Sequence, residues 1–179
     1  MMGGLVTSGA QGRGRNECVV YAPDGAEVVR YSKLHPFTLA GEAQAYVAGS
    51  AVSLFKLREF TISPFICYDL RFPEDFREAA QQGADLFTVI ANWPASRIAH
   101  WTALLKARAI ENQAYVIGVN RCGDDPQFSY TGQSVIFDPH GNMLAQAGSD
   151  EITISAELDL SAVIEYREKF PFLKDMHHR

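Results

Sequence analysis

The stretch "SLFKLREFTISPFICYDLRFPEDFREAAQQGADLFTVIAN" (residues 53–92) decides the fold, because β-rich segments enclose one helical segment. Residues 53–69 are typical of two strands, the second of which ends near Cys67. Residues 72–83 predict a short helix, because a proline and two acidic residues open the run and a glycine closes it. Residues 84–92 are mostly apolar, as in a buried strand. The order strand, helix, strand predicts a parallel crossover.

The remainder of the chain continues this alternation of strands and helices. We expect hairpins at residues 17–33 and 132–148. Further strands are expected at residues 114–120 and 151–158, and further helices at residues 97–112 and 159–170. These elements together predict an α/β layout with parallel crossovers and added hairpins.

Composition limits the classes of protein to consider. The chain has 179 residues, of which 47% are hydrophobic, and this suits one domain with a sizeable core. A net charge of −5 argues against a general nucleic-acid binder, and no apolar run approaches the roughly 20 residues of a membrane span. Residues 1–17 lack the features of a signal peptide. Three widely spaced cysteines argue against a disulfide framework or a zinc site, so we expect reduced thiols and a cytoplasmic setting.

Cys67 is the residue on which the functional interpretation depends. It follows a predicted strand and precedes a predicted helix, where backbone N–H groups favour a thiolate or an oxyanion. The carboxyl ends of strands in α/β sheets are also where sites are usually built. The alternative is a buried structural thiol, because free cysteines are among the most buried residues. Position alone leaves both interpretations open.

Histidine is the usual partner of a nucleophilic cysteine. The sequence contains five histidines and nothing in the pattern selects one of them as a base or as a metal ligand. They are His35, His100, His140, His177 and His178.

Five stretches of the chain resemble the nitrilase superfamily of carbon–nitrogen hydrolases, especially its omega-amidase-like branch, and they occur in the family's order. They are residues 16–37, 64–74, 84–94, 100–123 and 130–148. The resemblance implies a nitrilase-like α-β-β-α sandwich that is N-terminally incomplete. Residues 1–179 would then form a single, partial carbon–nitrogen hydrolase domain without the family's N-terminal strand and helices.

The resemblance also implies catalytic roles for particular residues. Cys67 matches the family nucleophile, and Lys33 in "YSKLHPF" matches the family lysine, although strand-end lysines are more often simply solvated. An ammonium group beside Cys67 would favour the thiolate and stabilise a developing oxyanion, with the backbone N–H of Tyr68 as a second donor. Glu42 resembles a further acidic residue near the lysine, the alternative being an ordinary loop carboxylate.

Three further residues are candidates for substrate binding. The planar fork of Arg71 suits a substrate carboxylate, and the alternative is an internal salt bridge, for instance with Glu111. Asn92 and Trp93 follow a buried strand and are expected to line a pocket, although Trp93 would equally well close the core.

The family's general-base glutamate is expected in an N-terminal region ahead of the residues present here. Glu17 and Glu27 lie too close to a hairpin turn to match it, so neither is assigned as the base. Without that base we expect severely slowed hydrolysis. A truncated remnant, an assembly subunit that keeps the scaffold, or a longer active chain are therefore alternatives to an active enzyme.

The implied reaction is hydrolysis of a small linear amide to an acid and ammonia through a thioester on Cys67. An omega-amide of a dicarboxylate fits Arg71, while other short amides, carbamoyl compounds and nitriles stay open. The resemblance implies no cofactor, no metal, and a homodimer or higher homo-oligomer. The net charge and the lack of a long apolar run predict no nucleic-acid or membrane partner.

Overall fold

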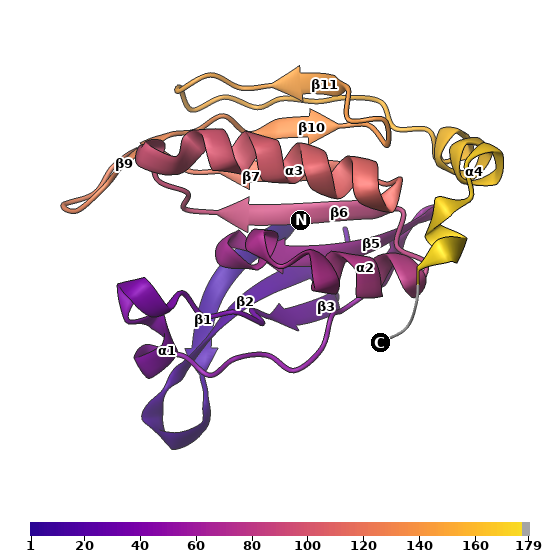
Figure 1. Ribbon diagram of the computed structural model, residues 1–179. Helices are drawn as coiled ribbons and strands as arrows, with labels where there is room; N and C mark the ends of the chain where they lie inside the picture. The colour runs from indigo at the N-terminus through magenta and orange to yellow at the C-terminus, as the bar shows by residue number, and fades with distance from the viewer. Residues whose placement is uncertain (177–179) are drawn as a thin grey trace.

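The computed structural model describes residues 1–176, which form a mixed α/β structure (Figure 1). The strands are β1 (Met2–Ser8), β2 (Gly14–Tyr21), β3 (Glu27–Ser32), β4 (Phe55–Leu57), β5 (Phe60–Ile66), β6 (Leu86–Ala91), β7 (Tyr115–Asn120), β8 (Cys122–Asp124), β9 (Ser129–Thr131), β10 (Val135–Phe137) and β11 (Met143–Gln146). The α-helices are α1 (Glu42–Ala45), α2 (Pro73–Gln81), α3 (Ile98–Asn112) and α4 (Leu160–Lys169). Short 3₁₀ turns occur at Ala10–Gly12, Thr38–Ala40, Cys67–Arg71, Ala95–Arg97 and Phe172–Asp175.

The strands form one large sheet and two smaller ones. The six-stranded sheet has the order β11-β10-β7-β6-β5-β4. Its central strands β5, β6 and β7 are parallel, as predicted, and β4, β10 and β11 join its edges as antiparallel neighbours. Strands β1, β2 and β3 form an antiparallel sheet, and β8 pairs with β9. The parallel centre places the carboxyl ends of β5, β6 and β7 at one edge.

Helices α2 and α3 lie across one face of the six-stranded sheet (Figure 1). Helix α2 begins at Pro73, whose missing N–H costs nothing in a first turn, and it ends before Gly83. Gly83 has a φ of +99°, a conformation that glycine adopts without strain. The buried face of α2 consists of Phe76, Ala79 and Ala80.

Aromatic side chains join this helical layer to the sheet. Phe65 of β5 stacks on Phe76 of α2 with 3.9 Å between ring centroids, and Phe87 of β6 meets the same ring at 5.2 Å. Trp101 and Leu105 of α3 are fully buried in the same cluster. The crossover predicted from the sequence is therefore confirmed, and its close packing gives the strand ends a rigid base.

The opposite face of the sheet packs against a second group of side chains. Successive strand residues point to opposite faces, so Ile62 and Leu86 face away from α2 and α3. They pack with Val20 of β2 and Val163 of α4. Of the expected α-β-β-α layers, residues 1–176 form the two sheets and the layer made by α2 and α3.

Several elements differ from the sequence-based expectation, among them the segment 151–158 and strand β1. The predicted strand at residues 151–158 is wrong: the segment has no regular secondary structure, although its exposure alternates as in a strand. An alternating pattern becomes a strand only when a neighbour supplies backbone hydrogen bonds, and no ladder within residues 1–176 includes this segment. Strand β1 is not expected from its glycine-rich sequence, yet it pairs with β2 from Met2 to Ser8.

Candidate active site

Cys67 lies on a strained elbow between β5 and the first 3₁₀ residues that follow it. Its φ is +49°, in the left-handed region that residues with a Cβ atom rarely occupy. Such a conformation costs on the order of 1–3 kcal/mol and persists only where the surroundings impose it. The 3₁₀ turn Cys67–Arg71 lies between β5 and α2, and α2 begins at Pro73, within the helix predicted at residues 72–83.

Lys33 and Glu42 form a buried ion pair. Lys33 follows β3, is 4% exposed, and places its Nζ 2.6 Å from Glu42 Oε2. Glu42 also accepts hydrogen bonds from the backbone N–H of Phe37 at 2.6 Å and from Asn16 Nδ2 at 2.9 Å. Burial raises the pKa of Glu42, but the bonds from Lys33, Phe37 and Asn16 outweigh it and hold this pKa below its usual range. The alternatives of a solvated lysine and an ordinary loop carboxylate are therefore wrong.

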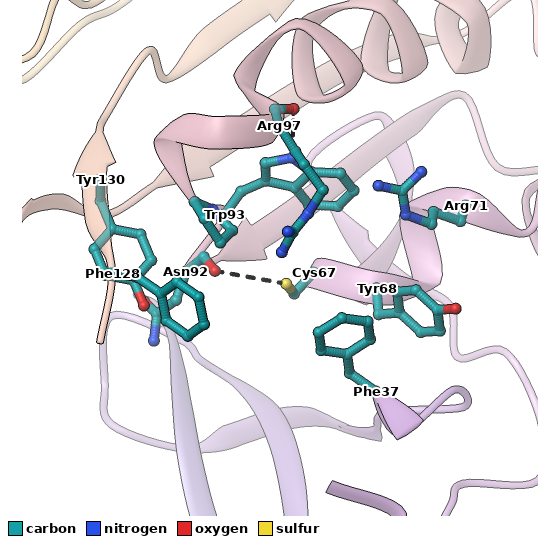
Figure 2. A pocket seen from close by; sticks show the side chains of 10 residues that line it. Phe37, Cys67, Tyr68, Arg71, Asn92, Trp93, Arg97, Phe128 and Tyr130 are labelled. Atoms are coloured by element: carbon teal, nitrogen blue, oxygen red, sulfur yellow. Dashed lines mark hydrogen bonds between the residues drawn. The ribbon is translucent and has the colours of Figure 1, made fainter. Parts of the chain in front are cut away.

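Cys67 borders two cavities. The first has a volume of about 170 Å³ and is lined mainly by aromatic side chains and two arginines, namely Phe37, Tyr68, Arg71, Trp93, Arg97, Phe128 and Tyr130, with Asn92 and Pro94 (Figure 2). The second, of about 630 Å³, contains the Lys33–Glu42 pair and is also lined by Cys67 and Asn92. The predicted nucleophile, lysine and acidic residue are thus brought to one place from three separate segments.

The protonation of Cys67 differs from the expectation. Burial raises the pKa of its thiol, Lys33 opposes that shift, and the charges of Glu42 and Asp69 add to it, so that the pKa lies above its usual value. Lys33 lowers the thiol pKa, as expected, but burial outweighs it, so the thiolate is not favoured overall. Glu42 offsets the charge of Lys33, and the 3₁₀ turn Cys67–Arg71 separates the thiol from the start of α2. The thiol Sγ lies 4.0 Å from the carbonyl oxygen of Asn92, to which it donates.

Arg71 lies in the first cavity without an acidic partner among the described residues. Its guanidinium carbon is 4.9 Å from the centroid of Trp93, and its Nη2 lies 3.3 Å from His100 Nδ1. The alternative of a salt bridge with Glu111 is wrong, because Glu111 pairs with Arg108 at 2.6 Å and with Arg77 at 3.2 Å.

Trp93 satisfies both interpretations of the sequence. It is 3% exposed and belongs to the core, yet it also forms part of the cavity wall. Its backbone N–H donates to Asn120 Oδ1 at 2.7 Å, and Asn120 Nδ2 donates back to the Trp93 carbonyl at 3.1 Å. Asn92 faces Cys67 through its backbone carbonyl. Asn120, at the end of β7, thus braces the loop that carries both predicted residues.

Several residues of the site were missed from the sequence. Arg97 ends a 3₁₀ turn and points into the first cavity, with its guanidinium carbon 6.0 Å from the centroid of Phe37 (Figure 2). Its place shortly after the carboxyl end of β6 is the signal that would have found it. Phe128 and Tyr130 reach the cavity from the β8–β9 hairpin, for which the sequence carries no comparable signal.

None of the three histidines within residues 1–176 forms a dyad with Cys67. His35 Nε2 lies 2.7 Å from Asp75 Oδ2, and the ring of His140 packs against Tyr166 with 3.9 Å between centroids. His100 contacts Arg71, as described above, and His177 and His178 lie outside the described residues. Within residues 1–176, no group of three or more His, Cys, Asp or Glu side chains is placed to hold a metal ion.

Comparison with known proteins identifies the family. The model of the carbon-nitrogen hydrolase family matches residues 1–168, and the chain belongs to that family. Within the nitrilase superfamily its similarity is to the omega-amidase-like branch. It is 45% identical over 177 residues to the omega-amidase YafV of Yersinia enterocolitica, covering 98% of this chain and 68% of that protein. It is 47% identical to the Escherichia coli K12 omega-amidase YafV, covering 84% of this chain and 59% of that protein. It is also 39% identical to the 2-oxoglutaramate amidase of Bacillus subtilis, covering 90% of this chain and 62% of that protein.

Solved structures agree with this assignment. The CN-hydrolase superfamily protein XC1258 of Xanthomonas campestris, described with an arsenic adduct in its active site, superposes with a TM-score of 0.91 at 32% identity. That match covers 99% of this chain and 69% of the solved chain. Nit3 of Saccharomyces cerevisiae superposes with a TM-score of 0.86 at 26% identity, covering 94% and 62%. The predicted nitrilase-like fold is confirmed, and the chain spans roughly three fifths to two thirds of the length of these relatives. The part of the chain described in the structure contains no helix long and apolar enough to cross a membrane.

Proposed function

We propose that this chain carries the nucleophilic site of an amidase that hydrolyses a small linear amide, an omega-amide of a dicarboxylate, to an acid and ammonia. The observation that carries the proposal is the meeting of Cys67, on its left-handed elbow, with the buried Lys33–Glu42 pair at two adjoining cavities. The amidases among the matched relatives support the same reaction.

The proposed chemistry proceeds through a thioester. Cys67 Sγ forms a bond to the amide carbon, and the negative charge that develops on the amide oxygen is stabilised by Lys33 and by the backbone N–H of Tyr68. Tyr68 stands second in its 3₁₀ turn, where N–H groups have no acceptor within the turn. The carbon–nitrogen bond then breaks and ammonia leaves with an added proton. Water attacks the thioester, releases the acid and restores the thiol.

A proton acceptor is needed, because burial raises the pKa of the Cys67 thiol. Among the described residues that line the two cavities, Glu42 is the one carboxylate. Its three hydrogen bonds and its lowered pKa make it a poor base. We assign Glu42 the role of holding Lys33 protonated and in place. The acceptor of the thiol proton is a carboxylate that the described residues do not supply.

The first cavity supports a substrate with a carboxylate at its far end. Arg71 and Arg97 both line it, and no acidic side chain does among the described residues. A guanidinium group suits a carboxylate because its planar fork donates two parallel hydrogen bonds. Aromatic walls and a volume of about 170 Å³ suit the short carbon chain between the two ends of such a substrate. Asn92 and Trp93 would border that carbon chain.

Further parts of the proposal concern the whole protein. We propose that residues 1–179 belong to a single carbon–nitrogen hydrolase domain, that it works in the cytoplasm, and that it forms a homodimer or a higher homo-oligomer. The three cysteines, all unpaired, fit a reducing setting. Half-exposed apolar side chains on and after α4, such as Ile164 and Phe170, fit an oligomer contact. A catalytically impaired remnant is not favoured, because a buried lysine beside an unpaired thiol has no evident structural use.

The test is ammonia release from a panel of amides, combined with peptide mass mapping. Omega-amides of four- and five-carbon dicarboxylates are compared with neutral amides of equal chain length, using the parent chain and Cys67→Ala. We expect the acyl group on the peptide that contains Cys67 and preference for the charged amides. Unchanged ammonia release by Cys67→Ala, or acylation of Cys122 instead, would refute the proposal. The mass measurement detects a first acylation even where turnover is slow.

A further inference from the structure

We propose that Asp69 is a positioning residue, which holds the elbow that carries Cys67 and the loop that carries Lys33 in a fixed relation to each other. This inference rests on the proposed function, in which these two side chains act on the same amide. Asp69 itself lines neither of the two cavities beside Cys67, so it acts through its neighbours.

The carboxylate of Asp69 is fully buried and accepts three hydrogen bonds from separate parts of the chain. Its Oδ2 accepts from the hydroxyl of Tyr31 at 2.7 Å and from the backbone N–H of Ile66 at 3.0 Å. Its Oδ1 accepts from the backbone N–H of His35 at 2.9 Å. A buried carboxylate with this set of donors is satisfied only while all three segments keep their places.

The three donors bracket the two proposed catalytic side chains. Tyr31 and His35 stand two residues before and two residues after Lys33, so both sides of the lysine are tied to the same carboxylate. Ile66 immediately precedes Cys67, whose left-handed conformation needs an imposed geometry. One side chain therefore links β3 and the loop after it to the end of β5.

The chemistry of the three donors requires an acid at this position. Two backbone N–H groups and a phenol hydroxyl all donate, and a carboxylate accepts without offering a hydrogen of its own. An asparagine would turn an NH₂ group toward at least one of these donors and leave the segment it faces without its bond. Burial raises the pKa of Asp69 to about 6, and the bonds from Tyr31, Ile66 and His35 work against that shift.

The experiment compares Asp69→Asn with a matched control, Asp85→Asn. Asp85 is also a buried acid whose pKa is raised to about 6, and its Oδ1 also accepts a backbone N–H, that of Thr61 at 3.0 Å. It precedes β6 and so lies at the end of the sheet opposite the site. Three quantities are measured on each chain: kcat and KM for the omega-amide, the pH dependence of Cys67 alkylation by iodoacetamide, and hydrogen exchange in peptides spanning residues 31–37 and 64–68.

For Asp69→Asn we expect kcat to fall about 100-fold while KM changes about twofold or less, because the reacting groups lose their alignment and the substrate cavity keeps its lining. Both peptides should lose exchange protection together, because both segments donate hydrogen bonds to the same Asp69 carboxylate. The negative charge of Asp69 raises the pKa of the Cys67 thiol, as does that of Glu42, whereas Lys33 lowers it. Removing the Asp69 charge should therefore move the alkylation profile of Cys67 to lower pH. An easier ionisation combined with slower catalysis is not expected from a general loss of stability.

Asp85→Asn should leave kcat, the alkylation profile and both peptides as in the parent chain. Tyr31→Phe removes only one of the three donors, so it should lower kcat about threefold and reduce the hydrogen-exchange protection of the 31–37 peptide. This variant tests the inference even if Asp69→Asn fails to fold. An equal loss of kcat in Asp69→Asn and Asp85→Asn would overturn the inference, as would loss of protection in one peptide alone. If the parent chain neither hydrolyses an amide nor becomes acylated at Cys67, the proposed function fails, while the exchange and alkylation measurements still decide the role of Asp69.

Discussion

Lys33 Nζ lies 2.6 Å from Glu42 Oε2, and this buried pair borders the same cavity as the thiol of Cys67. The two residues are only nine positions apart, yet they meet because a 3₁₀ turn and the left-handed Gly41, with a φ of +71°, fold the loop back onto the end of β3. The cation beside the thiol is therefore partly neutralised. Burial is the main reason why the pKa of Cys67 lies above its usual value, and the charge of Glu42 adds to that shift while Lys33 opposes it.

The first prediction concerns Glu42→Gln. We expect the free energy of unfolding at neutral pH to fall by about 3 kcal/mol, because Lys33 becomes a buried charge without a partner. The folded-state pKa of Glu42 lies below its ordinary value of 4.5, so its contribution to stability is present above that pH and is lost as pH falls through the folded-state pKa. Urea unfolding of the parent and the variant should therefore converge at low pH. Glu27→Gln, at a half-exposed ion pair with Arg30, is the control and should change little.

The second prediction concerns the reactivity of Cys67. Its alkylation rate should keep rising with pH beyond the ordinary thiol pKa of 9.0, because burial disfavours the thiolate. Lys33→Gln should raise the pKa further and slow alkylation at a given pH, whereas Arg30→Gln at the surface should not. Cys18 is fully buried with its pKa raised to about 11, and it should label only on unfolding. A labelling midpoint for Cys67 below 9.0 would contradict this account of the site.

The third prediction separates Arg71 from Arg97. If both guanidinium groups bind the substrate carboxylate, each substitution by Gln should raise KM for an omega-amide by roughly tenfold or more, the usual worth of a hydrogen bond to a charged group. A neutral amide of the same length should be handled by the variants as by the parent chain. Arg77→Gln, on the outer face of α2 beside Glu111, serves as the matched control. A loss confined to one variant would assign the carboxylate to that arginine alone.

The fourth prediction tests the packing of α3 against β7. A Cβ atom at Gly118 would clash with Leu105 and lie 2.8 Å from Trp101 Cζ2, both of which are fully buried. We expect Gly118→Ala to lower the free energy of unfolding by about 1–3 kcal/mol. In Gly3→Ala the added atom meets nothing within 4 Å, so this control should remain near the parent in thermal unfolding. Equal melting temperatures for the two variants would show that α3 shifts freely over the sheet.

Local patterns predicted most of the regular elements. Apolar runs and turn residues located β5, β6, β7, α2, α3 and α4, because these elements bury the side chains that mark them. The segment 151–158 has a strand-like pattern but no neighbouring strand among residues 1–176 pairs with it. Strand β1 has no such pattern, yet it is a strand because it pairs with β2. Hydrogen bonding to a partner decides such segments, and a partner is not visible in a local pattern.

The same division holds for the site. The order of the family-like stretches was enough to single out Cys67, Lys33 and Glu42, whose roles stay predictions. Arg97 and Tyr130 were not found, because each reaches the cavity from a turn or hairpin whose direction depends on its packing. Asp69 was not singled out from the sequence, because its role depends on donors from β3, from the loop after β3 and from the end of β5.

The sequence by itself determined the parallel crossover and the cysteine at the end of its first strand, since apolar periodicity and turn residues act over a few neighbouring positions. Only the tertiary structure decided the charge around that cysteine. The ion pair of Lys33 with Glu42, the burial that raises the pKa of Cys67, and the bonds from Tyr31 and His35 to Asp69 all depend on how separate elements pack together. Electrostatic effects depend on distance and burial in space, and these exist only once the chain has folded.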